Sequence, residues 1–283
     1  MNAASGKAQG GQIALVTGAS SGIGRITALK LAKRGAHVFI ACRSPERAQA
    51  ALHEMRAASG NALIEILPLD LGDFNSIRVC AQAFLARDLP LQLLINNAGL
   101  AGARGRSASG FEIAFGVNHL GHFLLTQLLL ERIKASTPAR IINVASNAHY
   151  RARAIDWEAV RRPTRTRSGL PEYSVSKLCN VLFSCELARR LAGTGVATYS
   201  LHPGVVATEI WRSVPWPLRP LMKLTMISPE QGAATTLFCA TSQSVAEESG
   251  NYYDKCRIKR PSRMAQDPRL WTELWDRSLA FTS

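Results

Sequence analysis

Apolar runs of strand length alternate with longer helical patterns along most of this chain. Short continuous apolar runs indicate strands that are buried on both faces. The predicted strands are Ile13–Thr17, His37–Ala41, Leu63–Leu67, Leu91–Ile95, Arg140–Val144 and Val196–Leu201. The predicted helices are Ile23–Arg34, Pro45–Ala58, Asp73–Ala86, Phe111–Lys134 and Tyr173–Leu191. Buried strands joined by helical crossovers predict an α/β fold with a doubly wound parallel sheet, whose ligands bind at the carboxyl ends of the strands.

No internal repeat, low-complexity tract or linker divides the 283 residues. We therefore predict a single domain over residues 11–283, preceded by a flexible N-terminus over residues 1–10. No signal-peptide core and no run of about 20 apolar residues is visible, so we do not expect a secreted or membrane-spanning protein. The six cysteines are widely spaced, which favours free thiols in a reducing, cytoplasmic compartment.

A glycine-rich loop, Thr17–Gly24, lies directly between the first predicted strand and the first predicted helix. Its glycines allow a tight turn, and its backbone N–H groups and the helix N-terminus favour a bound pyrophosphate. A glycine loop alone is weak evidence, but its place between a buried strand and a helix predicts dinucleotide binding. The predicted contacts are Gly18, Ser20, Ser21, Gly22, Ile23 and Gly24.

The end of the second predicted strand indicates which dinucleotide is bound. NAD-binding sites usually carry an acid there, which holds the ribose 2′-hydroxyl. This chain has Arg43 and no acid at that place. The guanidinium of Arg43 can bind a 2′-phosphate through its fork of donors, so we predict NADP(H) as the cofactor. The alternative is that Arg43 is an ordinary solvated surface residue.

Tyr173 and Lys177 are four residues apart and therefore share one face of a predicted helix. An ammonium group beside a phenol lowers the phenol pKa from its usual value of about 10. Tyr173 would then be able to donate or accept a proton near neutral pH. On its own, a Tyr-x-x-x-Lys pair is common and mostly structural.

Three further motifs accompany this pair in order along the chain. Asn97, Ala98 and Gly99 follow the fourth predicted strand, Asn118 lies in the next helix, and Ser146 follows the fifth strand. Together the motifs resemble the short-chain dehydrogenase/reductase family over residues 11–255, which implies a Rossmann-type fold. The resemblance implies that Ser146, Tyr173 and Lys177 are catalytic and that Asn118 completes a proton relay.

The same resemblance assigns further contacts to the cofactor. Asp70 and Leu71, after the third predicted strand, match the adenine contact of the family, although Asp70 could also cap a helix. Asn97, Ala98, Gly99, Tyr173 and Lys177 are implied cofactor contacts as well. Beyond the sixth strand, the resemblance places Pro203, Gly204, Val206 and Thr208 near the nicotinamide.

Several segments look like the retinol dehydrogenase branch of the family, namely Ala41–Arg43, Gly110–Glu112, Phe115–Phe123, Ser176–Phe183 and His202–Val206. That branch implies NADP(H) and lipophilic aldehydes and alcohols. Many retinol dehydrogenases carry an N-terminal membrane anchor; none is visible here, so we do not expect a membrane-resident retinoid role. A looser similarity to WW-domain oxidoreductases and light-dependent protochlorophyllide reductases also exists.

An apolar, proline-rich segment over about residues 205–228 lies where the family has its substrate lobe. Ser146, Tyr173, Trp211 and Trp216 are the predicted substrate contacts, and the apolar content suits a lipophilic ligand. Packing of these side chains into the core is the alternative.

The chain has 34 Lys and Arg against 20 Asp and Glu, a formal net charge of +14. Such a balance favours anionic partners. The arginine-rich interval between Ser146 and Tyr173 is a solvated surface excursion, or else a peripheral contact with an anionic membrane surface. No stripe of stacking aromatics is visible, so we do not expect nucleic-acid binding. Family resemblance implies pairing through the helices around Asn118 and Tyr173, as a homodimer or homotetramer.

No metal site is predicted. His119, His122 and His149 lack further ligands at metal spacing, and packing or hydrogen bonding is their expected role. We predict an NADP(H)-dependent oxidoreductase that interconverts a lipophilic aldehyde or ketone and its alcohol. The alternatives are reduction of a carbon–carbon double bond and a regulator that binds NADP(H) without turnover.

Overall fold

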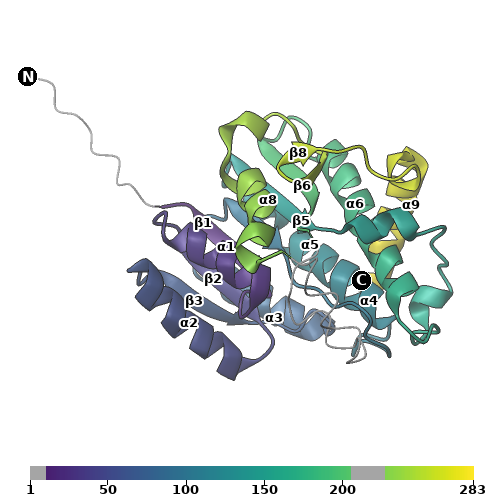
Figure 1. The fold of residues 1–283 in the computed structure, drawn as a ribbon, viewed down its shortest axis with the longest axis horizontal. Helices are drawn as coiled ribbons and strands as arrows, with labels where there is room; N and C mark the ends of the chain where they lie inside the picture. Colours follow the sequence, from purple (N-terminus) through teal and green to yellow (C-terminus); the bar gives the residue numbers. More distant parts are fainter. Residues whose placement is uncertain (1–10, 205–226) are drawn as a thin grey trace, which may run out of the picture.

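An eight-stranded sheet forms the centre of the molecule in the computed structural model, which describes residues 11–204 and 227–283 (Figure 1). The strand order is β3-β2-β1-β4-β5-β6-β7-β8, and all neighbours are parallel except β7 and β8. The strands are β1 (Ile13–Thr17), β2 (His37–Cys42), β3 (Ile64–Pro68), β4 (Leu93–Asn96), β5 (Ala139–Val144), β6 (Val196–His202), β7 (Tyr252–Asp254) and β8 (Arg257–Ile258). This topology confirms the predicted doubly wound α/β fold.

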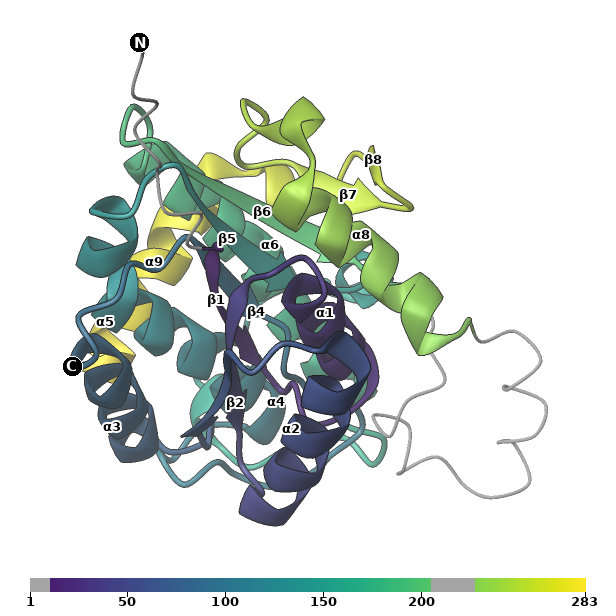
Figure 2. The same cartoon turned by 90° about the vertical axis from the view of Figure 1, so that its left-hand side faces the viewer.

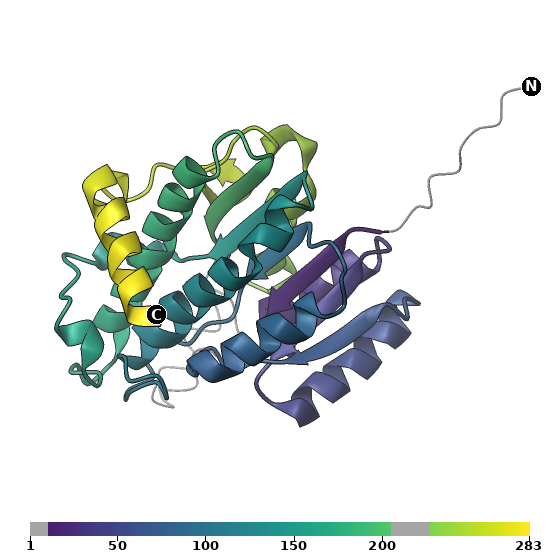
Figure 3. The same cartoon turned by 180° about the vertical axis from the view of Figure 1, so that it is seen from behind.

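Helices cover both faces of the sheet, as the edge-on view shows (Figure 2). One face carries α1 (Gly22–Ala32), α2 (Pro45–Ser59) and α8 (Pro229–Thr241). The other face, which is turned toward the viewer in Figure 3, carries α3 (Phe74–Leu85), α5 (Gly121–Lys134), α6 (Leu170–Arg190) and α9 (Pro268–Thr282).

Side chains from the two faces of strands β1 to β6 form two separate cores. On β1, Leu15 packs into the core beneath α3 and α5, whereas Ala14 and Val16 pack into the core beneath α1 and α2. All three side chains are fully buried. Because both faces are covered, the strands need continuous apolar runs, which is why they could be recognised in the sequence.

Local signals set the helix ends close to the predicted positions. Ser44 caps α2 by accepting a hydrogen bond from the Arg47 backbone N–H (3.4 Å), and Pro45 occupies the first turn. Gly60 ends this helix with φ 67°, a left-handed conformation that favours glycine. The predicted helix at Tyr173 begins three residues earlier, at Leu170, so Tyr173 lies inside the first turns of α6.

The predicted helix over Phe111–Lys134 is not regular. It consists of α4 (Ile113–Phe115), a π-helical turn η1 (Gly116–Leu120) and α5. Within the described residues, Ile113–Lys134 is the one helical run long and apolar enough to cross a membrane, whereas the sequence analysis found no apolar run of about 20 residues. In the fold, 72% of the residues in its apolar window are buried, as in a helix of a protein core.

The C-terminal helix α9 covers the outer surfaces of α5 and α6. Trp275 lies edge-on to Phe123, with ring centroids 5.2 Å apart, and contacts Phe183 at 6.0 Å. The guanidinium of Arg190 lies 4.3 Å above the Trp275 ring. The sequence analysis assigned no element after Leu201, so α8, α9, β7 and β8 are additions from the structure.

The six cysteines are free thiols, as predicted. Four are buried (Cys42, Cys80, Cys179 and Cys239), and Cys185 and Cys256 are half-buried. Burial raises the pKa of the buried Cys80 thiol to about 12, so this thiol stays protonated and inert.

Candidate active site

The glycine loop after β1 has the backbone geometry of a phosphate cradle. Gly18 and Gly22 adopt positive φ angles of 67° and 55°, which favour glycine. A Cβ atom on Gly24 would lie 2.6 Å from the Gly18 carbonyl oxygen, so only glycine fits where α1 approaches the loop. Ser21, the N-cap of α1, makes no capping hydrogen bond with its side chain, and the first N–H groups of the helix can bind an anion. These residues fit a dinucleotide pyrophosphate.

The side chain of Thr17 joins the ends of β1 and β4. Its Oγ1 accepts hydrogen bonds from the backbone N–H groups of Asn97 (2.9 Å) and Ala98 (3.0 Å). The Asn97 side chain donates in return to the Thr17 carbonyl oxygen (2.8 Å). The loop that carries Asn97, Ala98 and Gly99 is therefore fixed beside the phosphate cradle.

His122 extends this network toward Asn118. Nε2 of His122 lies 2.9 Å from the Thr17 hydroxyl, whose other acceptor, the Ile95 carbonyl oxygen, is at 3.4 Å, and Nδ1 of His122 faces the Asn118 carbonyl oxygen, which can only accept. Nδ1 of His122 therefore carries the proton and donates to the Asn118 carbonyl oxygen (3.0 Å). Burial lowers the His122 pKa to about 4, which keeps the ring neutral in this arrangement. The sequence analysis expected a hydrogen-bonding or packing role here.

Asn118 lies in the π-helical turn η1 and is fully buried. Its side-chain amide donates to the Leu100 carbonyl oxygen (3.0 Å) and to Oγ of Ser176 (2.9 Å). Its side-chain oxygen accepts from the Leu100 backbone N–H (2.9 Å). Asn118 thus ties the loop after β4 to α6, and the irregular helix turn is the kind often found at functional sites.

Ser146 and Tyr173 meet at the carboxyl end of β5. The Ser146 side chain is a hydrogen-bonding neighbour of the Tyr173 phenol, and Tyr173 is only 8% exposed. Burial raises the Tyr173 pKa above its usual value, and the hydrogen bond with Ser146 opposes this rise. Tyr173 is therefore a neutral phenol at neutral pH, able to donate its proton.

Lys177 lies one helical turn after Tyr173 and is 2% exposed. Its Nζ donates a hydrogen bond to the Val144 carbonyl oxygen (2.8 Å) and lies 5.8 Å from the centre of the Tyr173 ring. Burial lowers the Lys177 pKa to about 7. The sequence analysis expected a fixed ammonium to lower the Tyr173 pKa. That expectation was wrong: the Tyr173 pKa is raised, because burial disfavours both the Lys177 ammonium and the Tyr173 phenolate.

The Gly99 backbone lies between Asn118 and Lys177. A Cβ atom on Gly99 would lie 3.4 Å from both Oδ1 of Asn118 and Nζ of Lys177. Asn118, Ser146, Tyr173 and Lys177, predicted from three separate motifs, gather with the Gly99 loop at one edge of the sheet. The arrangement can hold a carbonyl oxygen against two hydroxyl groups.

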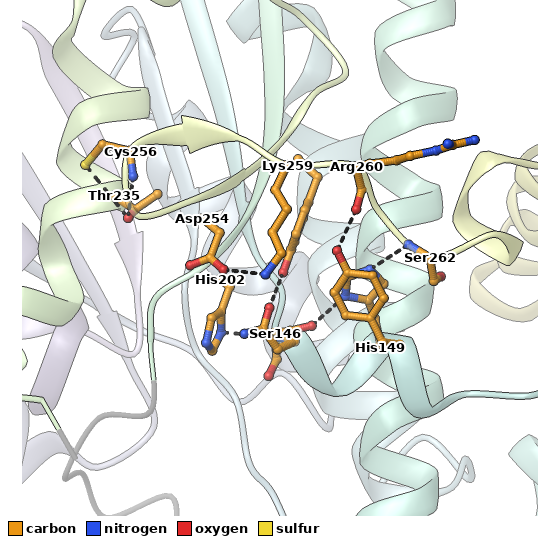
Figure 4. Close-up of polar contacts among 12 residues, drawn as sticks. Ser146, His149, His202, Thr235, Asp254, Cys256, Lys259, Arg260 and Ser262 are labelled. Atoms are coloured by element: carbon orange, nitrogen blue, oxygen red, sulfur yellow. Dashed lines mark hydrogen bonds and ion pairs between the residues drawn. The ribbon is translucent and has the colours of Figure 1, made fainter. Parts of the chain in front are cut away.

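Buried histidines surround the turn that carries Ser146 (Figure 4). Nδ1 of His149 is 2.7 Å from the Ser146 carbonyl oxygen, and Nδ1 of His202 accepts from the Asn147 backbone N–H (3.3 Å). The Asn147 side chain accepts from the Tyr252 hydroxyl (3.0 Å). Sequence reasoning found no partners for this turn, since Tyr252 lies in a short strand without a recognisable motif.

The residues predicted to bind adenosine lie at the ends of β2 and β3. Arg43 is exposed at the end of β2, whereas Arg25 is ion-paired with Glu54. Asp70 accepts a hydrogen bond from the Gly72 backbone N–H (2.8 Å), and Asp73 is the residue that caps α3. The alternative role of Asp70 as a helix cap is therefore wrong. Leu71 is buried, with its backbone against Gly121.

The structure describes the segment after β6 only in part. Pro203 and Gly204 follow the strand, and Gly204 has φ 92°. Val206, Thr208, Trp211 and Trp216, together with almost all of the predicted lobe at 205–228, lie outside the described residues. Among residues 11–204 and 227–283, no group of three potential metal ligands is present.

Comparison with known proteins identifies the protein family. The family model described as short chain dehydrogenase matches residues 12–158. Retinol dehydrogenase 11 of Homo sapiens is 44% identical over 270 residues, which cover 94% of this chain and 84% of that protein. A protein from Mycobacterium Paratuberculosis has a similar structure, with TM-score 0.76 and 32% identity over 96% of this chain and 93% of that one. A variant of actinorhodin polyketide ketoreductase with NADPH gives TM-score 0.68 and 25% identity over 85% and 94% of the chains.

The chain belongs to the short-chain dehydrogenase family. Within this family it lies on the retinol dehydrogenase-like branch. It is thus an NAD(P)(H)-dependent oxidoreductase that interconverts an alcohol and its carbonyl counterpart.

Proposed function

We propose that this enzyme uses NADP(H) to interconvert a lipophilic aldehyde or ketone and its alcohol, with Tyr173 as general acid and base. The observation that carries this proposal is the buried Tyr173 phenol with the Ser146 side chain as its hydrogen-bonding neighbour, and with Nζ of Lys177 5.8 Å from the centre of the Tyr173 ring. A substrate oxygen placed against both hydroxyls meets a proton donor and a second hydrogen-bond donor at once.

Three of the described residues have separate roles in the proposed reaction. When bound, the nicotinamide supplies or accepts the hydride. During reduction, Tyr173 donates its proton to the carbonyl oxygen, and the Ser146 hydroxyl donates a hydrogen bond to the same oxygen. Lys177, held by Val144, binds the ribose hydroxyls and, when protonated, stabilises the tyrosinate.

Asn118 acts through its backbone in this scheme. Its side chain is engaged with Leu100 and Ser176, and one lone pair of its carbonyl oxygen accepts from His122. The second lone pair can hold a water that links Lys177 to solvent. Replacement of the Asn118 side chain would therefore act on the position of this carbonyl and not on the water directly.

The preference for NADP(H) rests on the end of β2. Arg43 is exposed there, and Ser44 beside it caps α2, so Arg43 is the cation available to a 2′-phosphate. An acid is absent from the residues that end β2, which disfavours binding of a free ribose 2′-hydroxyl. The remaining cofactor contacts follow the family pattern along the glycine loop, Asp70, Leu71 and Asn97–Gly99.

Initial rates with NADPH and NADH test this preference. We expect Arg43→Asp to raise the KM for NADPH sharply and to change the KM for NADH much less, because repulsion replaces a charge-assisted contact. Arg25→Asp is the matched control, since Arg25 is already paired with Glu54. An unchanged NADPH/NADH ratio in Arg43→Asp would place the determinant elsewhere.

The lipophilic substrate class rests on kinship with proteins named retinol dehydrogenases and on the apolar segment 205–228. Each further CH₂ of a substrate contributes about 0.8 kcal/mol when buried, roughly fourfold in affinity. We expect kcat/KM to rise with chain length across a panel of aldehydes, and Trp216→Ala to flatten this gradient. A flat profile in the unaltered enzyme would contradict the lipophilic class.

We also propose that an arginine rim beside the active site contacts an anionic membrane surface. The arginine rim consists of eight exposed side chains, Arg104, Arg106, Arg151, Arg153, Arg161, Arg162, Arg165 and Arg167. In the part of the chain that the structure describes, its one ion pair within 4.0 Å is Arg162 with Glu158 (3.9 Å). At the opposite edge of the sheet, cations are paired, as Arg87 with Glu65 and Arg132 with Asp88.

Co-sedimentation with vesicles tests this contact. We expect binding to vesicles that contain phosphatidylserine and not to pure phosphatidylcholine, with a loss of roughly 100-fold when Arg151, Arg153 and Arg167 are changed to Gln. The control changes Lys30, Lys33 and Lys134 to Gln, which removes the same charge from other surfaces. Equal losses in both triple variants would show only a net-charge effect.

A further inference from the structure

His149 connects the turn that carries Ser146 to a segment more than a hundred residues away. We call residues 259–262 the C-terminal strap; it runs from β8 toward α9 and lies over the turn at Ser146–Arg151 (Figure 4). The Ser262 backbone N–H donates to Nε2 of His149 (3.1 Å), and the Tyr150 hydroxyl donates to the Arg260 carbonyl oxygen (2.6 Å). The strap is anchored in turn to the sheet, because the Lys259 backbone N–H donates to the Tyr252 carbonyl oxygen (2.8 Å).

The donor on the strap determines the tautomer of His149. A backbone N–H can only donate, so Nε2 of His149 must carry a lone pair. The ring proton then sits on Nδ1, which donates to the Ser146 carbonyl oxygen at 2.7 Å. The His149 backbone N–H donates to the same oxygen (3.1 Å), so the carbonyl of Ser146 is held from two directions.

Packing leaves the ring little freedom to turn. His149 is fully buried, with ring centroids 4.0 Å from Tyr150 and 4.8 Å from Tyr252. The charged group nearest on the strap, Lys259, is neutralised by Asp254 (2.7 Å). Burial lowers the His149 pKa, which favours the neutral ring that both hydrogen bonds require.

We propose that His149 is a positioning residue for Ser146: the strap selects its Nδ1–H tautomer, and this tautomer fixes the Ser146 backbone so that the hydroxyl meets Tyr173. The inference rests on the proposed function, because it assigns His149 to the orientation of that reaction's hydrogen-bond donor. Ser146 itself makes one other local contact, accepting from the Ala148 backbone N–H (3.1 Å). Loss of the His149 bond would let the turn rotate and weaken the hydroxyl pair.

Two substitutions separate the two bonds of the ring. In His149→Asn the side-chain amide takes the place of Nδ1 and can still donate to Ser146. In His149→Gln the side-chain oxygen reaches the place of Nε2 and can still accept from Ser262, but the donation to Ser146 is lost. We expect kcat to fall about 10- to 100-fold in His149→Gln and to stay within about threefold in His149→Asn, with the KM for NADPH unchanged in both.

His53→Gln is the matched control, since His53 is an exposed histidine on α2 whose ring contacts Gln49 (3.1 Å). Equal losses of kcat in His149→Asn and His149→Gln would overturn the inference, as would a loss that appears in the KM for NADPH. Wild-type kcat in His149→Gln would overturn it too.

The tautomer can be measured without turnover, so this arm distinguishes failure of the inference from failure of the proposed reaction. In ¹⁵N-histidine-labelled protein with NADPH, the signals that disappear in His149→Asn belong to His149. At pH 7 we expect the two-bond nitrogen–proton pattern of an Nδ1–H imidazole. An Nε2–H or doubly protonated ring would contradict the proposed role of the strap.

Discussion

Two polar clusters meet at the carboxyl edge of the sheet and differ in how their hydrogen bonds are satisfied. The Thr17 cluster (Thr17, Asn97, His122 and Asn118) is a closed network of neutral groups in which donors and acceptors are matched. The Ser146 cluster (Ser146, Tyr173 and Lys177) holds two buried titratable groups whose pKa values are shifted by burial. A matched network stabilises the fold, whereas buried groups with shifted pKa values are typical of a reacting site.

The difference separates the residues that support cofactor binding from those that take part in proton transfer. The Thr17 cluster fixes the loops that hold the cofactor, and it has no charge that changes near neutral pH. The Ser146 cluster retains groups that the fold would be more stable without. Variants of Thr17 should therefore change stability and cofactor affinity, and variants of the Ser146 cluster should change kcat.

The largest effect is expected from Tyr173→Phe. This change keeps the ring and removes the proton donor, so kcat should fall by roughly 10²–10⁴-fold while the dissociation constant of NADPH stays nearly constant. Tyr199→Phe is the matched control: that phenol is also buried, but it donates to the Val245 carbonyl oxygen away from the site (2.6 Å). A third of the wild-type kcat in Tyr173→Phe would contradict the assignment.

Thr17→Val should act on stability. It leaves the Ala98 backbone N–H without its acceptor, which costs about 1–3 kcal/mol, whereas the Asn97 N–H keeps the Ile95 carbonyl oxygen (3.0 Å). We expect the free energy of unfolding to fall and NADPH binding to weaken. Thr27→Val is the control, because the hydroxyl of Thr27 is buried in α1 without a hydrogen-bond partner. Denaturant titration should find this control neutral or stabilising, and equal losses would break the comparison.

Lys177→Met should reduce turnover and yet stabilise the fold. The Lys177 pKa is about 7 in the folded chain and near 10.5 when unfolded, so the unfolded chain binds more protons between these values. Stability therefore rises with pH from about 7 to about 10, and Lys177→Met should remove this rise. At pH 7 we expect a gain on the order of 2 kcal/mol, measured by urea unfolding. A loss of stability there would show that the bond to Val144 outweighs burial.

The smallest effect concerns His119, which lies beside Asn118 but outside both clusters. Burial lowers its pKa to about 3. Below about pH 6.5 His119 is therefore protonated in the unfolded chain and stays neutral in the folded chain. Stability should fall as pH decreases through this range. His119→Gln should reduce the fall between pH 6.5 and 5 by about 1–2 kcal/mol, measured by denaturant titration at each pH. A pH profile in His119→Gln identical to that of the unaltered protein would show that His119 is not the group responsible.

The sequence predicted the sheet well because its strands are buried on both faces and read as continuous apolar runs. It also brought Asn118, Ser146, Tyr173 and Lys177 together, since each follows or faces the carboxyl end of a strand. It failed for the Tyr173 pKa, because burial cannot be measured from the spacing of two residues. It also missed the contacts of His122 and His149, whose partners Thr17 and Ser262 are more than a hundred residues away along the chain.

The most direct test follows the hydride from the cofactor to the product. NADPH deuterated at nicotinamide C4, supplied as each epimer in turn, is incubated with the enzyme and a long-chain conjugated aldehyde, and the product is analysed by mass spectrometry and NMR. The account predicts an alcohol with one deuterium on its carbinol carbon from one epimer, and far slower labelling with Tyr173→Phe. Deuterium on a carbon of the reduced double bond, or no transfer with any aldehyde or ketone, would contradict it.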